Sequence, residues 1–202
     1  YTKEMQAKGY TILAPQMAPI HFDIVEALLR AEGYNCVLLP SVDHKAVDTG
    51  LKYVNNDICY PSILVTGQIM EAVLSGKYDL TRTAVLITQT GGGCRATNYI
   101  ALIRKALKDS GHEEVPVISL TAASGLGESS PGFNLFKPGL IVKAIYALLY
   151  GDLIMQLLYR TRPYETERGS ANRLYDSLMR RAKTLIPRTD RKSFYRLRRD
   201  TI

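Results

Sequence analysis

Short apolar segments alternate along the first 121 residues with longer segments in which apolar residues recur every three or four positions. The short segments predict strands over residues 10–15, 35–40, 84–88 and 115–120. The longer segments predict helices over residues 20–31, 45–54, 61–74 and 95–110. Near-continuous apolar strands separated by helices are typical of a parallel sheet covered on both faces. We therefore expect an α/β fold with a four-stranded, doubly wound (flavodoxin-like) parallel sheet.

The pattern changes after Thr121. A connector of small residues and glycines leads to two longer segments with helical periodicity, over residues 140–159 and 170–185. Ser170 is a residue type that commonly caps a helix, and we expect it to cap the second of these. The sequence thus predicts three parts: a cysteine-bearing α/β domain over residues 1–121, a helical region that packs on it over residues 122–186, and a basic tail over residues 187–202.

Positive charge is concentrated near the end of the sequence. Residues 156–202 hold 13 of the 26 Lys+Arg but only 5 of the 19 Asp+Glu, which leaves the rest of the chain nearly neutral. Such a segment could contact nucleic acid, an acidic protein surface or a phosphorylated ligand, or it could be a solvated amphipathic helix with a loose end. It has no zinc-finger spacing, glycine-aromatic motif or helix-turn-helix pattern, so we expect no nucleic-acid partner.

The sequence indicates no membrane partner. The longest apolar run, over residues 140–158, is interrupted by four residues: Lys143, Gly151, Asp152 and Gln156. Residues 1–9 lack the apolar core and the cleavage pattern of a signal peptide. Three cysteines without an export signal argue for a reducing compartment, and we expect a cytoplasmic location.

Two of the three cysteines lie just before expected helices. Cys59 occurs in the segment NNDICYPS, and Cys94 occurs in the segment TGGGCRATN. Free amide groups and the positive end of a helix dipole stabilise negative charge at such positions, which favours the thiolate form. Thiolates bind soft metals and iron–sulfur clusters, so this pair is the leading candidate site. Cys36 lies inside an expected strand, and we expect it to be a small core residue.

The residues around these cysteines are compatible with more than one role. Two thiolates do not complete a tetrahedral metal site, and the three histidines show no paired metal spacing. The glycines before Cys94 would allow a phosphate to approach the backbone, or would let the chain wrap an inorganic cluster. The Gly-Lys-Ser/Thr ending of a phosphate-binding loop is absent. Asn55, Asn56 and Asp57 are either turn formers or hydrogen-bond donors to the first thiolate.

Three segments carry a resemblance to a known family: residues 55–62, 89–99 and 137–139. They resemble the carboxy-terminal region of large activases of 2-hydroxyacyl-CoA dehydratases, which is itself similar to the subunits of 2-hydroxyglutaryl-CoA dehydratase. The resemblance extends over residues 10–185. It implies a four-iron four-sulfur cluster that cysteines hold at the ends of α/β domains. The activases of this family use ATP hydrolysis to drive a low-potential electron into that cluster.

The resemblance implies that Cys59 and Cys94 are cluster ligands. Nearby loop residues would then line the cluster: Asn55, Asn56, Gly91, Gly92, Gly93, Arg95 and Asn98. In the family a further cysteine comes from a second α/β domain, whereas no cysteine follows Cys94 in this sequence. The ATP-binding domains of the activases are also missing from these residues. We therefore do not expect this chain alone to be catalytic.

From the resemblance we expect a module of a dehydratase activator that contributes cysteine ligands to an iron–sulfur cluster during electron delivery to acyl-CoA dehydration. The expected partners are the rest of the parent activase polypeptide and a dehydratase subunit. Two other functions stay open. One is a non-catalytic docking module with a degenerate dehydratase-like fold, in which the basic tail contacts the partner. The other is an acyl-CoA-binding module that uses the crevice at the strand ends.

Overall fold

The computed structural model describes residues 1–40, 43–89, 98–121, 132–133 and 137–202. The chain forms two compact units, and each consists of two segments of the sequence. Unit 1 contains Tyr1–Met17 and Tyr34–Asn134, and unit 2 contains Ala18–Gly33 and Leu135–Ile202. The helix after the first strand, which lies within the expected domain over residues 1–121, therefore belongs to the second unit.

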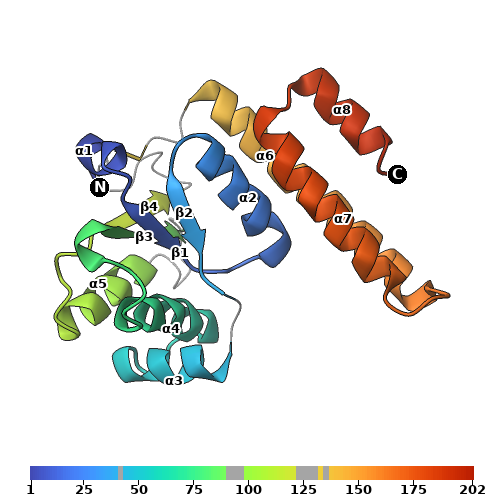
Figure 1. The fold of residues 1–202 in the computed structure, drawn as a ribbon. Coiled ribbons are helices and arrows are strands. Elements are labelled where there is room, and N and C mark those ends of the chain that lie inside the picture. The colour runs from blue at the N-terminus through green and yellow to red at the C-terminus, as the bar shows by residue number, and fades with distance from the viewer. Residues whose placement is uncertain (41–42, 90–97, 122–131, 134–136) are drawn as a thin grey trace. The chain divides into compact units, whose positions relative to one another are not determined.

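Unit 1 is built on a four-stranded parallel sheet (Figure 1). Its strands are β1 (Thr11–Ala14), β2 (Asn35–Leu38), β3 (Thr83–Gln89) and β4 (Val117–Thr121). The strand order is β2-β1-β3-β4, and Thr11 at the start of β1 aligns with Asn35 on one side and with Thr83 on the other. The expected flavodoxin-like order is confirmed. Because all four strands are parallel, their carboxyl ends share one edge of the sheet, where ligand sites form in such folds.

One face of the sheet packs against α4 (Tyr60–Leu74) and α5 (Tyr99–Asp109). The helix α5 has its buried residues at helical spacing on one side, whereas α4 buries residues on all sides because another helix also packs against it. The core of unit 1 joins residues of the strands to residues of both helices: Leu13, Val85 and Ile87 from the sheet, Val65, Ile69, Met70 and Val73 from α4, and Tyr99, Ile103 and Leu107 from α5. This packing fixes where the first turns of α4 and α5 lie.

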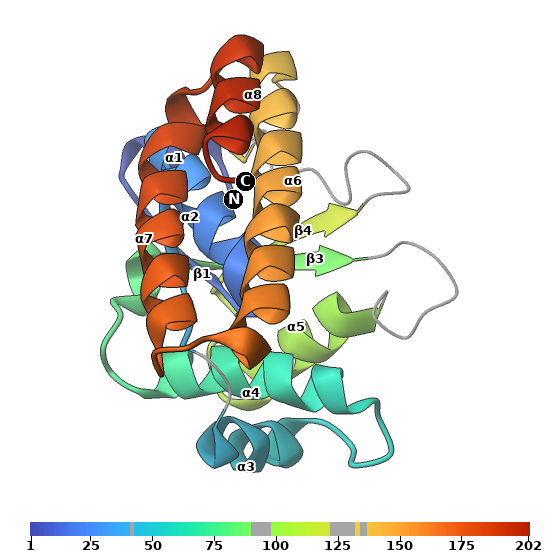
Figure 2. The same cartoon turned by 90° about the vertical axis from the view of Figure 1, so that its right-hand side faces the viewer.

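The helix α3 (His44–Tyr53) lies along α4, as both views of the fold show (Figures 1 and 2). Two glycines allow this close approach. A Cβ atom at Gly50 would lie 2.1 Å from the carbonyl oxygen of Ile63, and one at Gly67 would lie 1.7 Å from the carbonyl oxygen of Ala46. Any larger residue at either position would force the two helix backbones apart.

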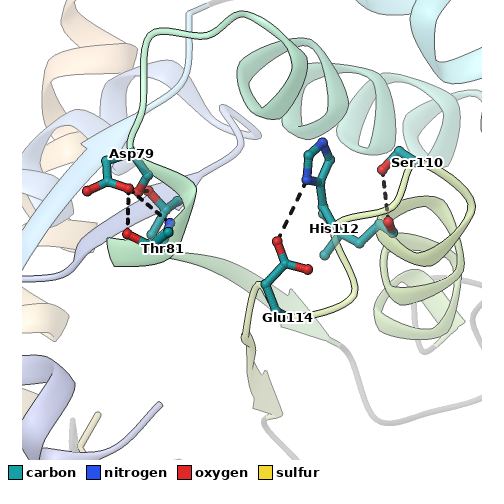
Figure 3. A network of polar contacts seen from close by, with 7 residues as sticks. Asp79, Thr81, Ser110, His112 and Glu114 are labelled. Atoms are coloured by element: carbon teal, nitrogen blue, oxygen red, sulfur yellow. Dashed lines mark hydrogen bonds and ion pairs between the residues drawn. The ribbon is translucent and has the colours of Figure 1, made fainter.

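Local polar contacts close the turns that lead into β3 and β4 (Figure 3). Asp79 Oδ1 accepts hydrogen bonds from the backbone N–H of Thr81 (3.1 Å) and from its hydroxyl group (2.6 Å). Before β4, His112 Nδ1 lies 3.8 Å from Glu114 Oε1, and the Ser110 hydroxyl donates to a carbonyl of α5 at 2.8 Å. These turns lie at the amino ends of the strands, so they contribute nothing to the edge at which the cysteine site is expected.

Unit 2 is entirely helical in its described residues. It contains α2 (Pro19–Ala31), α6 (Pro138–Thr161), the 3-10 turn η3 (Arg162–Tyr164), α7 (Ser170–Leu185), the 3-10 turn η4 (Ile186–Arg188) and α8 (Arg191–Arg199). The helices share one apolar core: Ile20, Ile24, Ala147, Tyr150, Ile154, Leu178, Met179, Ala182, Ile186, Phe194 and Leu197. The C-terminal helices that the sequence predicts are thus present.

The end of the chain is a packed helix in the part that the sequence assigns to a basic tail. The helix α8 buries Phe194 and Leu197, which lie three residues apart and so face the same side. Asp190 caps its amino end by accepting a hydrogen bond from the backbone N–H of Ser193 at 2.7 Å. Two apolar residues are enough to anchor a helix in which most other positions are basic.

The expected cap at Ser170 is wrong. The N-cap of α7 is Gly169, whose φ of 84° is a left-handed conformation that glycine adopts without strain. The carboxylate of Glu165 replaces the missing side-chain cap, because it accepts hydrogen bonds from the backbone N–H groups of Gly169 (2.7 Å) and Ala171 (3.1 Å). Those two bonds lower the pKa of Glu165.

Of the described helices, one is long and apolar enough to cross a membrane by length and composition. It spans Pro138–Tyr164, and 28% of its most apolar window is buried. Core helices of soluble proteins pass the same test, so this finding is weak support for a membrane span. It does show that many apolar residues of α6 are not buried.

Candidate functional site

Cys59 occupies the N-cap position of α4, as the sequence predicts for a cysteine at a helix start. Its carbonyl oxygen accepts the first helical hydrogen bond, from Ser62 N at 2.9 Å, while its thiol makes no capping hydrogen bond. The first turn contains Pro61, which has a φ value suited to the start of a helix. Cys59 is partly exposed as a residue, and it also packs against the core of unit 1.

The loop before Cys59 is stabilised by its own asparagine. The side-chain oxygen of Asn55 accepts a hydrogen bond from the backbone N–H of Asp57 at 3.1 Å, and its carbonyl oxygen accepts one from Ile58 N at 3.1 Å. This is the geometry of a turn former. Asn55, Asn56 and Asp57 are all exposed. Asn55 therefore forms a turn just before Cys59.

The thiol of Cys59 faces the beginning of α5. Cys59 Sγ lies 3.4 Å from the hydroxyl oxygen of Tyr99, which is the first residue of α5 and is 4% exposed. Asn98, the preceding residue, is the exposed N-cap of α5 and makes no side-chain capping bond. The first turns of α4 and α5 thus meet at the carboxyl edge of the sheet. Two positive helix ends next to each other favour an anion or a thiolate there.

Two buried hydroxyl groups have no hydrogen-bond partner among the described residues. Ser62, in the first turn of α4, is fully buried, and Ser119 in β4 is 8% exposed. Ser119 aligns with Ile87 of β3, two residues before the carboxyl end of β4. Buried hydroxyl groups are usually satisfied.

The described residues do not assemble a complete metal site. No group of three His, Cys, Asp or Glu side chains among them could hold a metal ion. Cys36 lies in β2 and is 1% exposed. A four-iron cluster needs four donors, and Cys59 is one suitable soft donor. The donor set therefore fits a cluster only in part, and the other ligands are not among the described residues.

Most of the glycine-rich motif lies outside the described residues. These predicted site residues are Gly91, Gly92, Gly93, Cys94 and Arg95. Of the predicted set the structure describes Cys59, Asn55, Asn56 and Asn98, and it brings Cys59 to the start of the helix that follows the glycine-rich motif. Sequence reasoning missed Tyr99 and Ser62. The signal for Tyr99 is an aromatic residue at the first position of a helix, directly after the second cysteine motif.

A separate cavity of about 90 Å³ lies beside α4. Its lining combines apolar, acidic and basic side chains: Leu39, Pro40, Asp43, Ala46, Gln68, Glu71, Ala72, Ser75, Lys77 and Tyr78. Pockets for drug-sized ligands usually measure about 300–1,000 Å³. The cavity is too small for an acyl-CoA, so it does not favour the acyl-CoA-binding alternative.

Comparison with known proteins does not add to these observations. No family model matches the chain, and neither a curated protein nor a solved structure matches it.

Proposed function

We propose that this chain is a module of a 2-hydroxyacyl-CoA dehydratase activator, and that Cys59 and Cys94 are ligands to an iron–sulfur cluster. The resemblance of the two cysteine motifs supports the family. The observation that carries the site is the 3.4 Å contact between Cys59 Sγ and the hydroxyl of Tyr99. Tyr99 follows Cys94 by five residues in the sequence. The contact of Cys59 with Tyr99 therefore joins the first cysteine motif to a residue close to the second cysteine.

The start of α4 suits a thiolate ligand. Cys59 is the N-cap of a 15-residue helix, and the positive end of a helix dipole is a favourable place for a negatively charged ligand. The Tyr99 hydroxyl can donate a hydrogen bond to that sulfur, and hydrogen bonds to ligand sulfurs tune the potential of a cluster. When bound, a four-iron four-sulfur cluster would supply a one-electron carrier for acyl-CoA dehydration. The protein's part is to hold the sulfur of Cys59 and to position it.

Two cysteines are half of the ligand set of a four-iron cluster. The remaining donors would come from the rest of the parent activase polypeptide or from a dehydratase subunit, which are the proposed partners. In this proposal the module works in the cytoplasm and is not catalytic by itself. Cys59 and Cys94 would hold part of a group that supplies one-electron chemistry to those partners.

Anaerobic reconstitution of the full polypeptide that contains this chain tests the proposal. Ferrous iron and sulfide are added, and bound iron, the visible absorption and the electron spin resonance spectrum after reduction are measured. We expect Cys59→Ser and Cys94→Ser each to lower the iron content and to alter the spectrum. Cys36→Ala is the matched control and should leave both unchanged, because Cys36 is buried inside β2. A cluster that survives both serine substitutions would overturn the proposal.

A further inference from the structure

One face of α6 exposes an unbroken set of aliphatic side chains. We call this set the α6 stripe: Ile141, Val142, Ile145, Leu148 and Leu149, which are 39%, 44%, 49%, 49% and 52% exposed. The spacings of three, four, seven and eight residues place all five on one side of the helix. The stripe is about 12 Å long at 1.5 Å per residue. It contains no polar side chain.

The core of unit 2 uses the opposite side of the same helix. Ala147, Tyr150 and Ile154 are at most 1% exposed and belong to the core of unit 2. The α6 stripe is therefore not the side by which α6 is held in its unit. Half-exposed aliphatic side chains of this number form a patch of roughly 300–400 Å², a size at which patches on monomers are often functional.

The basic helix α8 borders the stripe. The ring of Tyr146 on α6 stacks on the ring of Phe194 on α8, with centroids 4.2 Å apart and planes inclined by 10°. Tyr146 lies one turn from both Val142 and Leu149, so the contact places α8 next to the stripe. A hydrogen bond of 2.7 Å between the hydroxyl groups of Tyr150 and Thr201 holds the other end of α8 to α6.

The charge on α8 has one sign. Its nine residues include five basic side chains and no acidic one, and all five are exposed: Arg191, Lys192, Arg196, Arg198 and Arg199. Arg199 pairs with Asp200 at 3.6 Å. Within the described part of the chain, Arg191, Arg196 and Arg198 form no salt bridge. Their guanidinium groups are available to carboxylates of another molecule.

We propose that the α6 stripe and α8 together form a docking surface for an acidic amphipathic helix of a partner protein. The aliphatic ridge of that helix would pack on the stripe, whose spacing matches the anchor positions of helix-to-groove recognition. Its Asp and Glu residues would pair with the arginines of α8. This inference does not involve Cys59, so it stands or fails independently of the proposed cluster.

The same observations argue against two other occupants. A second copy of the chain would bring one α8 towards another basic surface, and the stripe is well below the area of about 800 Å² per partner that stable dimers bury. An anionic bilayer would meet Asp152, which continues the stripe one turn beyond Leu148 and is 53% exposed. His21 holds that carboxylate in place at 2.9 Å. A carboxylate at this position opposes burial of the stripe in the hydrocarbon of a bilayer, where it would lose its hydration.

Synthetic helical peptides of about 18 residues, long enough to form a stable helix when stapled, serve as probes. One carries a leucine ridge flanked by glutamates, a second has the same ridge flanked by lysines, and a third has the glutamates with its leucines scrambled. Fluorescence anisotropy at low and at high salt measures their binding. We expect the first peptide to bind at least about tenfold more tightly than the other two, and to weaken at high salt.

Variants of the protein locate the binding surface. Ile145→Asp, and separately the double change Arg191→Glu with Arg198→Glu, should each weaken the first peptide about tenfold or more. Leu51→Asp and Lys52→Glu on α3 are matched controls, because Leu51 is 45% exposed and both lie in unit 1. The controls should bind as the unchanged protein does. Circular dichroism confirms that every variant retains its helices.

Three results would overturn the inference. The scrambled acidic peptide could bind as tightly as the first, which would mean that charge alone attracts it. The protein could bind phosphatidylserine–phosphatidylcholine vesicles while ignoring all peptides, which would assign the surface to a membrane. Finally, sedimentation could show a dimer that Ile145→Asp dissociates, which would assign it to a second copy of the chain.

Discussion

The thiol of Cys59 lies 3.4 Å from the hydroxyl group of Tyr99, and this contact joins the first turn of α4 to the first residue of α5. Tyr99 belongs to the core of unit 1, while its hydroxyl reaches the sulfur of Cys59, a partly exposed residue. The core residue Tyr99 thus contacts the side chain of Cys59, which makes no capping hydrogen bond in α4. The contact also positions Cys59 at the carboxyl edge of the sheet, next to the helix that follows Cys94.

The exposure of the two described cysteines predicts their chemical reactivity. Cys59 is partly exposed at a helix start, whereas Cys36 is 1% exposed within β2. In the native protein, iodoacetamide should alkylate Cys59 at least about tenfold faster than Cys36. Peptide mass spectrometry after timed quenching measures both rates. In urea the two rates should converge, and faster labelling of Cys36 under native conditions would contradict the burial described.

The contact between α3 and α4 predicts a large loss of stability from a single methyl group. Gly67→Ala would place a Cβ atom 1.7 Å from the carbonyl oxygen of Ala46, so the two helices must separate. We expect unfolding in urea to show a loss of about 3 kcal/mol, at the upper end for overpacked cores.

The control for this change is Gly139→Ala in α6. No atom lies within 4 Å of a Cβ built at Gly139, so this variant should stay within about 1 kcal/mol of the original protein. Equal effects of the two substitutions would show that α3 and α4 are not packed as closely as described.

Most of the fold follows from local sequence patterns. The strand at residues 10–15 is found as β1, and the expected helix over residues 170–185 matches α7. The strand order follows from the short parallel connections. The helix α1 (Lys3–Ala7) escapes such reasoning because it has five residues and buries none of them. Its signal is the cap, in which Thr2 accepts a hydrogen bond from the backbone N–H of Met5 at 3.2 Å.

Only the features of the candidate site that depend on neighbouring residues in the sequence could be predicted. Cys59 could be placed at a helix start because Pro61 and the loop before it are local signals. The approach of Tyr99 could not be predicted, since it depends on how α4 and α5 pack against the sheet. The unpartnered hydroxyl of Ser62 is also a property of tertiary packing. The charge of α8 was evident in the sequence, whereas its position beside Tyr146 was not.

A double-mutant cycle tests the packing of α2 against α6 within unit 2. A Cβ atom at Gly151 would lie 2.6 Å from Cδ2 of His21, and the bond of His21 to Asp152 prevents the ring from moving freely. Gly151→Ala should therefore destabilise the protein by about 1–2 kcal/mol. In a His21→Ala background the same change should be neutral or stabilising, because alanine favours a helix and the clash is gone.

Urea unfolding of the four proteins measures the coupling between the two positions, which we expect to be about 1–3 kcal/mol. Additive effects would mean that the imidazole ring of His21 is not packed on Gly151.

The start of α7 predicts a pH-dependent contribution to stability. Hydrogen bonds from the backbone of Gly169, and then of Ala171, hold the pKa of Glu165 below its ordinary value of 4.5. Because the folded-state pKa is lowered, the stabilisation is complete above pH 4.5 and is lost as the pH falls through the folded-state pKa. Glu165→Gln should therefore lower the melting temperature at pH 7, and the difference from the original protein should shrink below pH 4.5.

Glu167→Gln is the matched control, since Glu167 meets α7 through an exposed ion pair with Arg173. Thermal unfolding between pH 7 and pH 3 measures both variants, and a difference for Glu165→Gln that widens as the pH falls would rule out the carboxylate as the cap of α7.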